Sequence, residues 1–339
     1  MRLIVDGFGK FLSKRDNQIV VKESGDEVDF FLADELEQVI ITGKGSVSFD
    51  AMQLLAEYNV DLVVLNWMGD IVYRLSPPER KNISARREQF HAYYDQRGGF
   101  LCKQFIFSKM NNQRSLLGTL ARSRENKNPE ISDSIWQCHE KLSFYSKRLM
   151  KIRENKIELI RDKIMGLEGQ ASVEYWQGFK EVVDPELGFV SRSGRNAIDG
   201  VNSLLNYGYG ILRGQVWRSI HLSGLDPYAG FLHADRYGRA SLVFDLMEEF
   251  RQQVVDKSVL KLLNKNKVNV SDFVVEDGLC KISNDLRRSL ITQVMKRLES
   301  EIKIDGRSRS WYDIIDFQAK LMVNFLLKKD NYQGFYWRW

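Results

Sequence analysis

The chain has 339 residues, of which 43% are hydrophobic and 28% are charged, and this length and balance favour a well-packed protein of two domains. No stretch approaches the roughly 18 uncharged apolar residues that cross a bilayer, which argues against a membrane protein. The first acid, Asp6, comes too early for a signal peptide, so we expect a cytoplasmic protein. The cysteines number three and lie far apart, which argues against a disulfide framework and a zinc cluster.

The net charge of +5 is unevenly distributed along the chain. Residues 1–75 carry 7 Lys and Arg against 13 Asp and Glu, a net charge of −6, whereas the rest carries 43 against 32, a net charge of +11. This asymmetry predicts that any polyanion binds the second part of the chain. On charge alone, an equally good explanation is that long helices carry many lysines and arginines.

Short strands are predicted through the first 76 residues. Runs of β-branched and aromatic residues alternate there with Gly and Asp clusters such as Ser24-Gly25-Asp26, a pattern typical of strands and turns. Gly7-Phe8-Gly9 lacks the third glycine and the strand–helix context of a nucleotide-binding loop, so a turn is predicted there. The predicted strands cover residues 2–5, 18–22, 28–32, 38–42, 61–65 and 70–73, and a helix is predicted at 48–58.

The strand pattern ends at Pro77-Pro78, because proline cannot donate to a sheet ladder. Prolines are scarce after this point, and apolar residues recur at spacings of three and four, which indicates helices. The predicted helices cover residues 85–122, 131–165, 171–180, 196–221, 240–263, 283–298 and 311–328.

The predicted fold class is therefore α+β, with a small N-terminal β-rich, sandwich-like domain followed by a larger all-α domain. The β-domain is assigned to residues 1–76, a linker to 77–84, and the helical domain to 85–339.

The helix predicted from residue 240 carries a narrow acidic stripe. At 100° per residue its apolar side chains form a broad face, and Asp245, Glu248 and Glu249 fill the stripe that is left. Two interpretations stay open. A stripe that faces water is an ordinary solvated surface, whereas a stripe buried beside another helix needs a cation or arginine partners, because burying carboxylates is costly.

A loop shaped by glycines and Pro227 precedes this helix and presents His233. His233 lies fifteen positions before Glu248, and an imidazole close to carboxylates suits Mn²⁺ and tolerates Mg²⁺. Arg236 and Arg239 follow on the same loop, where they can hold phosphate oxygens.

Further ordered segments of the chain carry a family signature. One is Leu167-Glu168-Gly169-Gln170-Ala171-Ser172, followed by Tyr175-Trp176; another runs from Arg192-Ser193-Gly194-Arg195 to Tyr209; the most specific runs from Gly224 to Arg251. Together they resemble the signatures of the CRISPR-associated integrase family, the near-universal adaptation protein of those systems. Lys109, Asn112 and Gln113 also fit the first long helix of that family. The resemblance covers the whole chain, including the β-rich domain.

The resemblance implies a divalent-metal site built from one glutamate, one histidine and one further acid, in the helical domain. Carried over residue by residue, the catalytic residues and metal ligands are Glu168, His233 and Glu248, with Mg²⁺ or Mn²⁺ as the cofactor. Asp245 is also acidic in relatives, so it stays either an alternative third ligand or a residue that supports the ligands. In isolation Glu168 would be an unremarkable acid beside a glycine.

The resemblance also implies a homodimer that works with a small companion CRISPR-associated adaptation protein on double-stranded, branched DNA. In the implied reaction, the 3′-hydroxyl of a short DNA fragment attacks a phosphodiester of a repeat array by metal-assisted transesterification. DNA contacts are predicted for Arg192, Arg195, Arg236 and Arg239, although solvation or an internal ion pair explains each of them equally well.

Other functions remain open from the sequence. One is a metal-dependent nuclease of branched DNA or RNA, in which water replaces the 3′-hydroxyl. Another is a DNA-binding scaffold whose metal site is dormant. The aromatic C-terminal segment Phe335-Tyr336-Trp337-Arg338-Trp339 has two interpretations as well, because it can dock on a partner or on DNA bases, or pack against its own domain.

Overall fold

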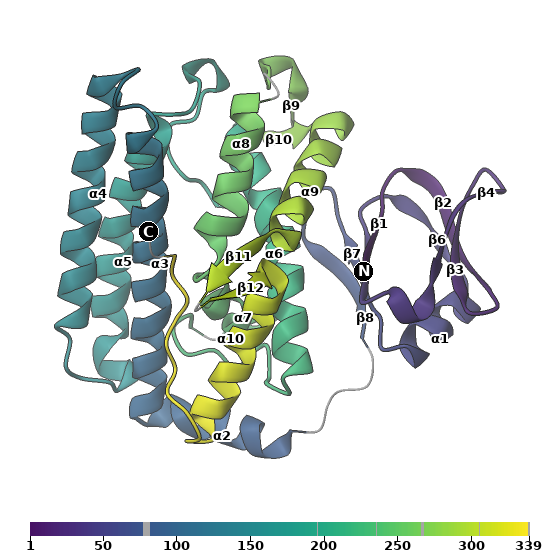
Figure 1. The fold of residues 1–339 in the computed structure, drawn as a ribbon, viewed down its shortest axis with the longest axis horizontal. Coiled ribbons are helices and arrows are strands. Elements are labelled where there is room, and N and C mark those ends of the chain that lie inside the picture. The colour runs from purple at the N-terminus through teal and green to yellow at the C-terminus, as the bar shows by residue number, and fades with distance from the viewer. Residues whose placement is uncertain (77–81, 195, 235, 266–267, 305, 338–339) are drawn as a thin grey trace. The chain divides into compact units, whose positions relative to one another are not determined.

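The computed structural model describes residues 1–76, 82–194, 196–234, 236–265, 268–304 and 306–337. The chain divides into two compact units, Met1–Glu79 and Arg80–Trp339, which can be followed by colour in Figure 1. Pro77-Pro78, Arg195 and the last two residues of the aromatic C-terminal segment lie outside the described residues. In the described part of the chain, no helix is both long and apolar enough to span a bilayer.

The first unit packs one sheet against another over a shared apolar core. One sheet has the order β1-β5-β7-β8, with β8 antiparallel to β7, and the other has the order β4-β3-β2-β6, with β6 parallel to β2. Leu12, Ile19, Val39 and Leu55 belong to one buried cluster that joins both sheets and the helix α1. The bounds are β1 Arg2–Val5, β2 Phe8–Arg15, β3 Gln18–Glu23, β4 Asp26–Leu32, η1 Ala33–Glu35, β5 Gln38–Ile41, β6 Lys44–Val47, α1 Phe49–Glu57, β7 Asp61–Leu65 and β8 Ile71–Leu75.

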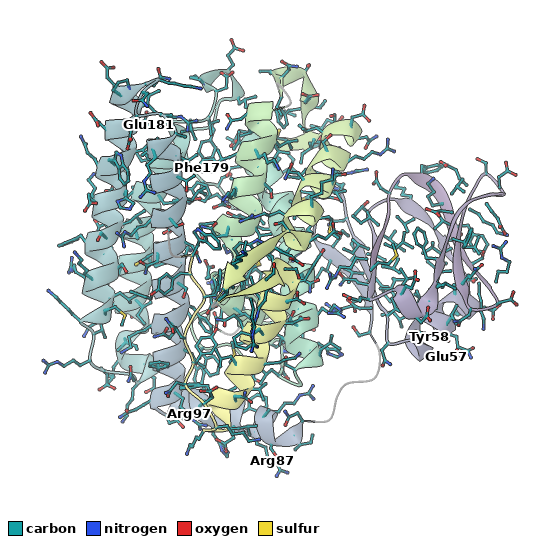
Figure 2. All side chains as sticks on the ribbon, in the orientation of Figure 1. Glu57, Tyr58, Arg87, Arg97, Phe179 and Glu181 are labelled. Atoms are coloured by element: carbon teal, nitrogen blue, oxygen red, sulfur yellow. The ribbon has the colours of Figure 1, made fainter. Side chains whose placement is uncertain are left out.

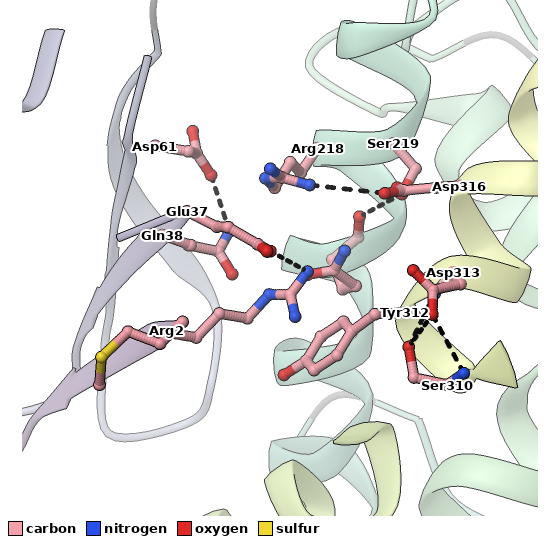
Figure 3. Close-up of polar contacts among 12 residues, drawn as sticks. Arg2, Glu37, Gln38, Asp61, Arg218, Ser219, Ser310, Tyr312, Asp313 and Asp316 are labelled. Carbon is pink, nitrogen blue, oxygen red and sulfur yellow. Dashed lines mark hydrogen bonds and ion pairs between the residues drawn. The ribbon is translucent and has the colours of Figure 1, made fainter. Parts of the chain in front are cut away.

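Strands β5 and β7 are nearly continuous apolar runs because parallel strands are covered on both faces. Val39 and Leu62 are almost fully buried. At the start of β7, the buried Asp61 carboxylate accepts hydrogen bonds from Gln38 Nε2 at 2.7 Å and Arg74 Nη2 at 2.8 Å, the first of which is drawn in Figure 3. These partners offset the cost of burying the charge.

The prediction of a turn at Gly7-Phe8-Gly9 is wrong in part, because β2 already begins at Phe8. Gly7 and Gly9 have φ angles of 107° and 74°, which glycine adopts without a Cβ clash. The register between β2 and β6 shifts between Phe8 and Lys10. The glycines therefore mark an irregular entry into a strand.

The second unit is predominantly helical. Helices α3, α4 and α5 lie side by side, as Figure 1 shows, and α6 is buried along most of its length against α7, α9 and α10. Side chains such as Phe179 fill the space between the helices (Figure 2). The bounds are α2 Ile83–Tyr94, α3 Gln96–Arg122, α4 Pro129–Met150, α5 Ile157–Lys180, η2 Pro185–Leu187, α6 Gly200–Leu222, α7 Ser241–Met247, η3 (a π-helix) Gln252–Asp256, α8 Lys257–Lys265, η4 Val270–Asp272, α9 Asn284–Glu299 and α10 Trp311–Leu326.

The prediction of a strand-rich N-terminal region followed by a helical region is confirmed. The helical unit also holds short antiparallel hairpins that the all-α prediction left out: β9 (Phe273–Glu276) with β10 (Leu279–Ile282), and β11 (Glu301–Ile304) with β12 (Arg307–Ser310). The first turns at Asp277-Gly278, both with positive φ. Asp-Gly between apolar runs is a strong hairpin signal that was available in the sequence.

Several predicted helix boundaries differ from the structure. The helix predicted at 85–122 is broken at Asp95, whose carboxylate accepts a hydrogen bond from Arg97 N and caps α3, and α2 begins at Ile83, inside the predicted linker. The predicted helices 131–165 and 171–180 are divided at the wrong place, because α4 ends at Met150 and α5 continues through Gly169. Glu168 therefore lies within a helix and not after one.

Candidate functional site

Two of the predicted ligands, Glu168 and Glu248, meet at a lysine. Glu168 lies on α5, Glu248 caps the C-terminal end of α7, and Lys109 reaches them from α3. Lys109 Nζ donates to Glu168 Oε1 at 2.5 Å and lies 2.8 Å from Glu248 Oε2. Ser172 Oγ, one turn along α5, also donates to Glu168 Oε1 at 2.8 Å, and Arg251 Nε lies 3.1 Å from Glu248 Oε1.

Burial and charge set the protonation of this cluster. Burial alone would raise the pKa of Glu248, but Arg251 and Lys109 outweigh it and lower that pKa to about 2. The pKa of Glu168 is also lowered, because Lys109 overcomes the effect of burial. Conversely, burial disfavours the ammonium of Lys109, but Glu248 and Glu168 raise its pKa above the ordinary value. The cluster therefore contains two carboxylates and a charged lysine at neutral pH.

A cavity of about 690 Å³ opens beside this cluster. Its walls combine the two carboxylates with cationic and aromatic side chains, an arrangement suited to a polyanion with stacking bases. These lining residues include Lys109, Glu168, Trp176, Lys180, Arg192, Tyr209, Glu248 and Arg251.

Asp245 is used by the loop that carries His233. Its fully buried carboxylate accepts the backbone N–H of Phe231 at 2.6 Å, of Leu232 at 3.0 Å and of His233 at 3.0 Å. The same carboxylate lies 2.6 Å from His233 Nδ1. Because an ionised carboxylate only accepts hydrogen bonds, this contact places a proton on Nδ1 and leaves Nε2 as the basic nitrogen of the imidazole.

The loop needs glycine at position 230 to approach the helix this closely. A Cβ at Gly230 would lie 2.6 Å from Ser241 Cβ and 2.9 Å from Asp245 Oδ2. Gly230 therefore allows the loop that carries His233 to pack closely against α7.

The structure brings Glu168 and Glu248 together more closely than it brings His233 to either. Within the described ranges, no group of three or more His, Cys, Asp and Glu side chains is arranged to hold a metal ion. His233 is nevertheless near enough to help lower the pKa of Glu248, although it does so less than Arg251 and Lys109. The Lys109 ammonium stands between the two carboxylates.

The residues present fit a hard or borderline divalent cation. Glu248 Oε2 is buried and makes no hydrogen bond, so it keeps a lone pair available despite the nearby ammonium. The Glu168 and Glu248 carboxylates and the His233 imidazole are donor types that suit Mn²⁺ or Mg²⁺, although the described residues do not gather all three around one point. Both carboxylate oxygens of Asp245 accept hydrogen bonds from backbone N–H groups of the loop that carries His233.

The predicted DNA-binding arginines differ in their surroundings. Arg192 lines the cavity and donates to Asn202 Oδ1 at 2.8 Å and to Asn206 Oδ1 at 2.6 Å. Arg236 is exposed, and Arg239 is half-buried with its guanidinium 5.2 Å from the ring centroid of Phe244. Arg195 falls outside the described residues.

Sequence reasoning gave no role to Lys109, Lys180 or Arg251 in this site. The signal for Arg251 was available, because it follows Glu248 by three positions and such pairs share a helix face. No sequence signal connects Lys109 with Glu168, since 59 positions separate them.

Comparisons with known proteins identify the family of the chain. The family model described as CRISPR associated protein Cas1 matches residues 3–296. A CRISPR-associated endonuclease Cas1 of Archaeoglobus fulgidus is 41% identical over 345 residues, with 100% of both chains covered. A solved casposase bound to integration product has a TM-score of 0.82 at 24% identity, covering 98% of this chain and 92% of that one. A chain of a Cas6-RT-Cas1–Cas2 complex has a TM-score of 0.80 at 20% identity, with 99% and 36% covered.

The structural likenesses show that the fold is shared with a casposase and with a Cas1-containing complex. The family match and the curated relative go further: the chain belongs to the Cas1 family of CRISPR-associated proteins, and that relative is named an endonuclease. The family resemblance predicted from the sequence segments is thereby confirmed.

Proposed function

We propose that this protein is a metal-dependent DNA integrase and endonuclease of CRISPR adaptation, which joins the 3′-hydroxyl ends of short DNA fragments to a repeat array. The observation that carries the proposal is the meeting of Glu168 and Glu248, from different helices, at the edge of a cavity lined by cationic side chains. Carboxylates hold the cation that phosphoryl transfer needs, and the cationic lining suits a DNA backbone.

The residues of this chain would have separate roles in the reaction: some hold the metal ion, and others bind the DNA. Glu168, Glu248 and His233 Nε2 would hold Mg²⁺ or Mn²⁺, and Asp245 keeps the imidazole in the required tautomer. A bound divalent cation supplies Lewis-acid polarisation of the phosphoryl oxygen and stabilises the leaving oxygen. Lys180 and Arg192 line the cavity, where they would bind phosphate oxygens and orient the strand, with Asn202 and Asn206 holding the Arg192 guanidinium.

We propose double-stranded, branched DNA as the substrate, and a homodimer together with a small companion adaptation protein as the working assembly. The names of the structural neighbours support this assignment, because one is a casposase bound to integration product and another is a Cas1–Cas2-containing complex. The net charge of +11 beyond residue 75 supports DNA binding by the helical unit.

The test is a joining assay with purified protein and a branched DNA that carries a labelled 3′-hydroxyl arm, in Mn²⁺, Mg²⁺ or chelator. Glu168→Ala, His233→Ala and Glu248→Ala are each expected to lower joining by about a thousandfold or more, because the loss of a metal ligand removes several kcal/mol of transition-state stabilisation. Binding of the same DNA should be largely kept.

Glu174→Ala is the matched control. Glu174 lies on α5, as Glu168 does, but it accepts a hydrogen bond from Lys141 Nζ at 2.9 Å. It is expected to join DNA like the wild type. Wild-type joining by any of the three site variants would contradict the proposed site. Cleavage without joining would instead identify a nuclease of branched nucleic acid, and binding without any product would identify a scaffold.

A further inference from the structure

The carboxylate pair already has cationic partners. The side chains of Lys109, Glu168 and Glu248 are 13%, 18% and 5% exposed, so the lysine is held between the two acids with little solvent. Arg251 contacts Glu248 from the other side. Two negative and two positive side chains therefore balance to a net charge of zero in this cluster.

This balance opposes the entry of a divalent cation. A cation placed between Glu168 and Glu248 would meet the Lys109 ammonium at short range, in a buried site where like charges repel more strongly than in water. It would also leave two positive charges without partners. The carboxylates can receive the cation only if Lys109 withdraws, or if an anion arrives with it.

Lys109 has the means to withdraw. Its side chain lines the cavity, and its ammonium would exchange the hydrogen bond to Glu168 Oε1 and the ion pair with Glu248 Oε2 for new partners there. Gln113 lies four positions further along α3, lines the same cavity, and has a buried Oε1 that makes no hydrogen bond. Residues four apart on a helix are neighbours, so this amide oxygen is a ready acceptor for the displaced ammonium.

We propose that Lys109 is the resident counter-ion of Glu168 and Glu248, and that it couples divalent-cation binding to DNA binding. When the cation enters, the Lys109 ammonium moves into the cavity and pairs with a DNA phosphate. This inference rests on the proposed function and deepens it. In this role Lys109 contacts the substrate, and it keeps the metal affinity low until a phosphodiester is in place.

The test measures Mn²⁺ binding by the paramagnetic resonance signal of free Mn²⁺. Wild type, Lys109→Met and Lys103→Met are titrated alone and with a branched DNA whose 3′ ends are dideoxy-terminated, after subtraction of the Mn²⁺ bound by DNA alone. Lys103 is a matched control on the same helix, because its ammonium binds the backbone oxygens of Ile152 and Glu154. Thermal melting in chelator shows whether each variant is folded.

Without DNA, Lys109→Met is expected to bind Mn²⁺ about tenfold more tightly than the wild type, because one repelling charge is gone. The DNA should raise the wild-type affinity for Mn²⁺ by about tenfold, and by linkage Mn²⁺ should raise the DNA affinity equally. The gain should be much smaller in Lys109→Met, whereas Lys103→Met should follow the wild type. The rise in Mn²⁺ affinity on adding DNA is measured in the wild type alone. It therefore tests the coupling even if Lys109→Met does not fold.

Equal or weaker Mn²⁺ binding by folded Lys109→Met would overturn the inference, and so would a wild-type affinity that DNA leaves unchanged. If the wild type still joins DNA in Mn²⁺, the proposed function survives either result. If the protein neither binds Mn²⁺ in any condition nor joins DNA, both the proposed function and the proposed role of Lys109 are overturned.

Discussion

Asp245, Glu248 and Glu249 lie within five residues of one another at α7, and each contacts a different part of the helical unit. Asp245 organises the loop of His233, whereas Glu248 meets Lys109 and Glu168. Glu249 accepts hydrogen bonds from Tyr332 Oη at 2.6 Å and from two further donors, and burial raises its pKa to about 7. Asp245 therefore holds the loop of His233, Glu248 belongs to the carboxylate pair, and Glu249 binds the C-terminal segment.

Asp245→Asn should destabilise the helical unit and displace His233. An asparagine has one acceptor oxygen in place of two, so backbone N–H groups of the loop would be left buried without partners, at a cost of about 3 kcal/mol. The melting temperature is expected to fall by roughly 6–12 °C, which calorimetry would measure. Joining activity should fall at temperatures where the variant is still folded.

Asp226→Asn is the control for this loop. Asp226 accepts one backbone hydrogen bond, from Tyr228 N at 2.8 Å, which an asparagine oxygen can also accept. Similar melting temperatures for the two variants would show that Asp245 does not organise the loop.

At the scale of elements, the described C-terminal residues pack against the helical unit, along the course drawn in yellow in Figure 1. Phe335 stacks on Phe250 with ring centroids 6.0 Å apart and meets the edge of Trp311 at 5.5 Å. Trp337 N donates to Asn112 Oδ1 at 2.8 Å. Of the two interpretations of this segment, packing against its own domain is the one the described residues show.

A chain that ends at Gly334 should be less stable than the full chain. It loses the aromatic contacts of Phe335 and a hydrogen bond to the buried Glu249, which together stabilise the fold by about 3 kcal/mol. The expected fall in melting temperature is roughly 6–12 °C. Phe144→Ala, at a side chain that is 56% exposed on α4, should change it little. An unchanged melting temperature after truncation would mean that the segment contributes no stability and is free to dock elsewhere.

At the scale of the whole molecule, a buried polar network makes stability depend on pH. Asp256 accepts hydrogen bonds from Tyr175 Oη at 2.6 Å and from Tyr209 Oη, and so links α5 and α6 to the π-helix η3. Burial raises the pKa of Asp256 from 3.8 to about 6, although the two tyrosines oppose it. Between these values the folded chain holds a proton that the unfolded chain releases, so stability falls as pH rises.

Asp256→Asn should remove this part of the pH dependence. Relative to the variant, the wild type is expected to lose about 2 kcal/mol of unfolding free energy between pH 4 and pH 7. Urea denaturation at several pH values measures the difference. Asp133→Asn, at an exposed position on α4, should leave the wild-type profile intact. Parallel profiles for wild type and Asp256→Asn would show that Asp256 does not titrate in this range.

The sequence by itself determined that a strand-rich region precedes a helical one, and it identified the family. Strand β7 was predicted with its observed bounds, because a run of β-branched residues between turn signals has few other solutions. The segments around Glu168, His233 and Glu248 identified the family because their residue types and order are specific. Helix boundaries were predicted less well, since Asp95 resembles any other polar residue until its capping hydrogen bond is seen.

Only the tertiary structure decided which side chains meet. Periodicity shows that a helix has an acidic stripe, but it does not show which helix covers that stripe. Asp245 and Glu248 differ in their contacts, because backbone N–H groups of a loop reach the first and a lysine from α3 reaches the second. Lys109 and Glu168 are close because α3 and α5 pack together, and packing depends on the whole chain.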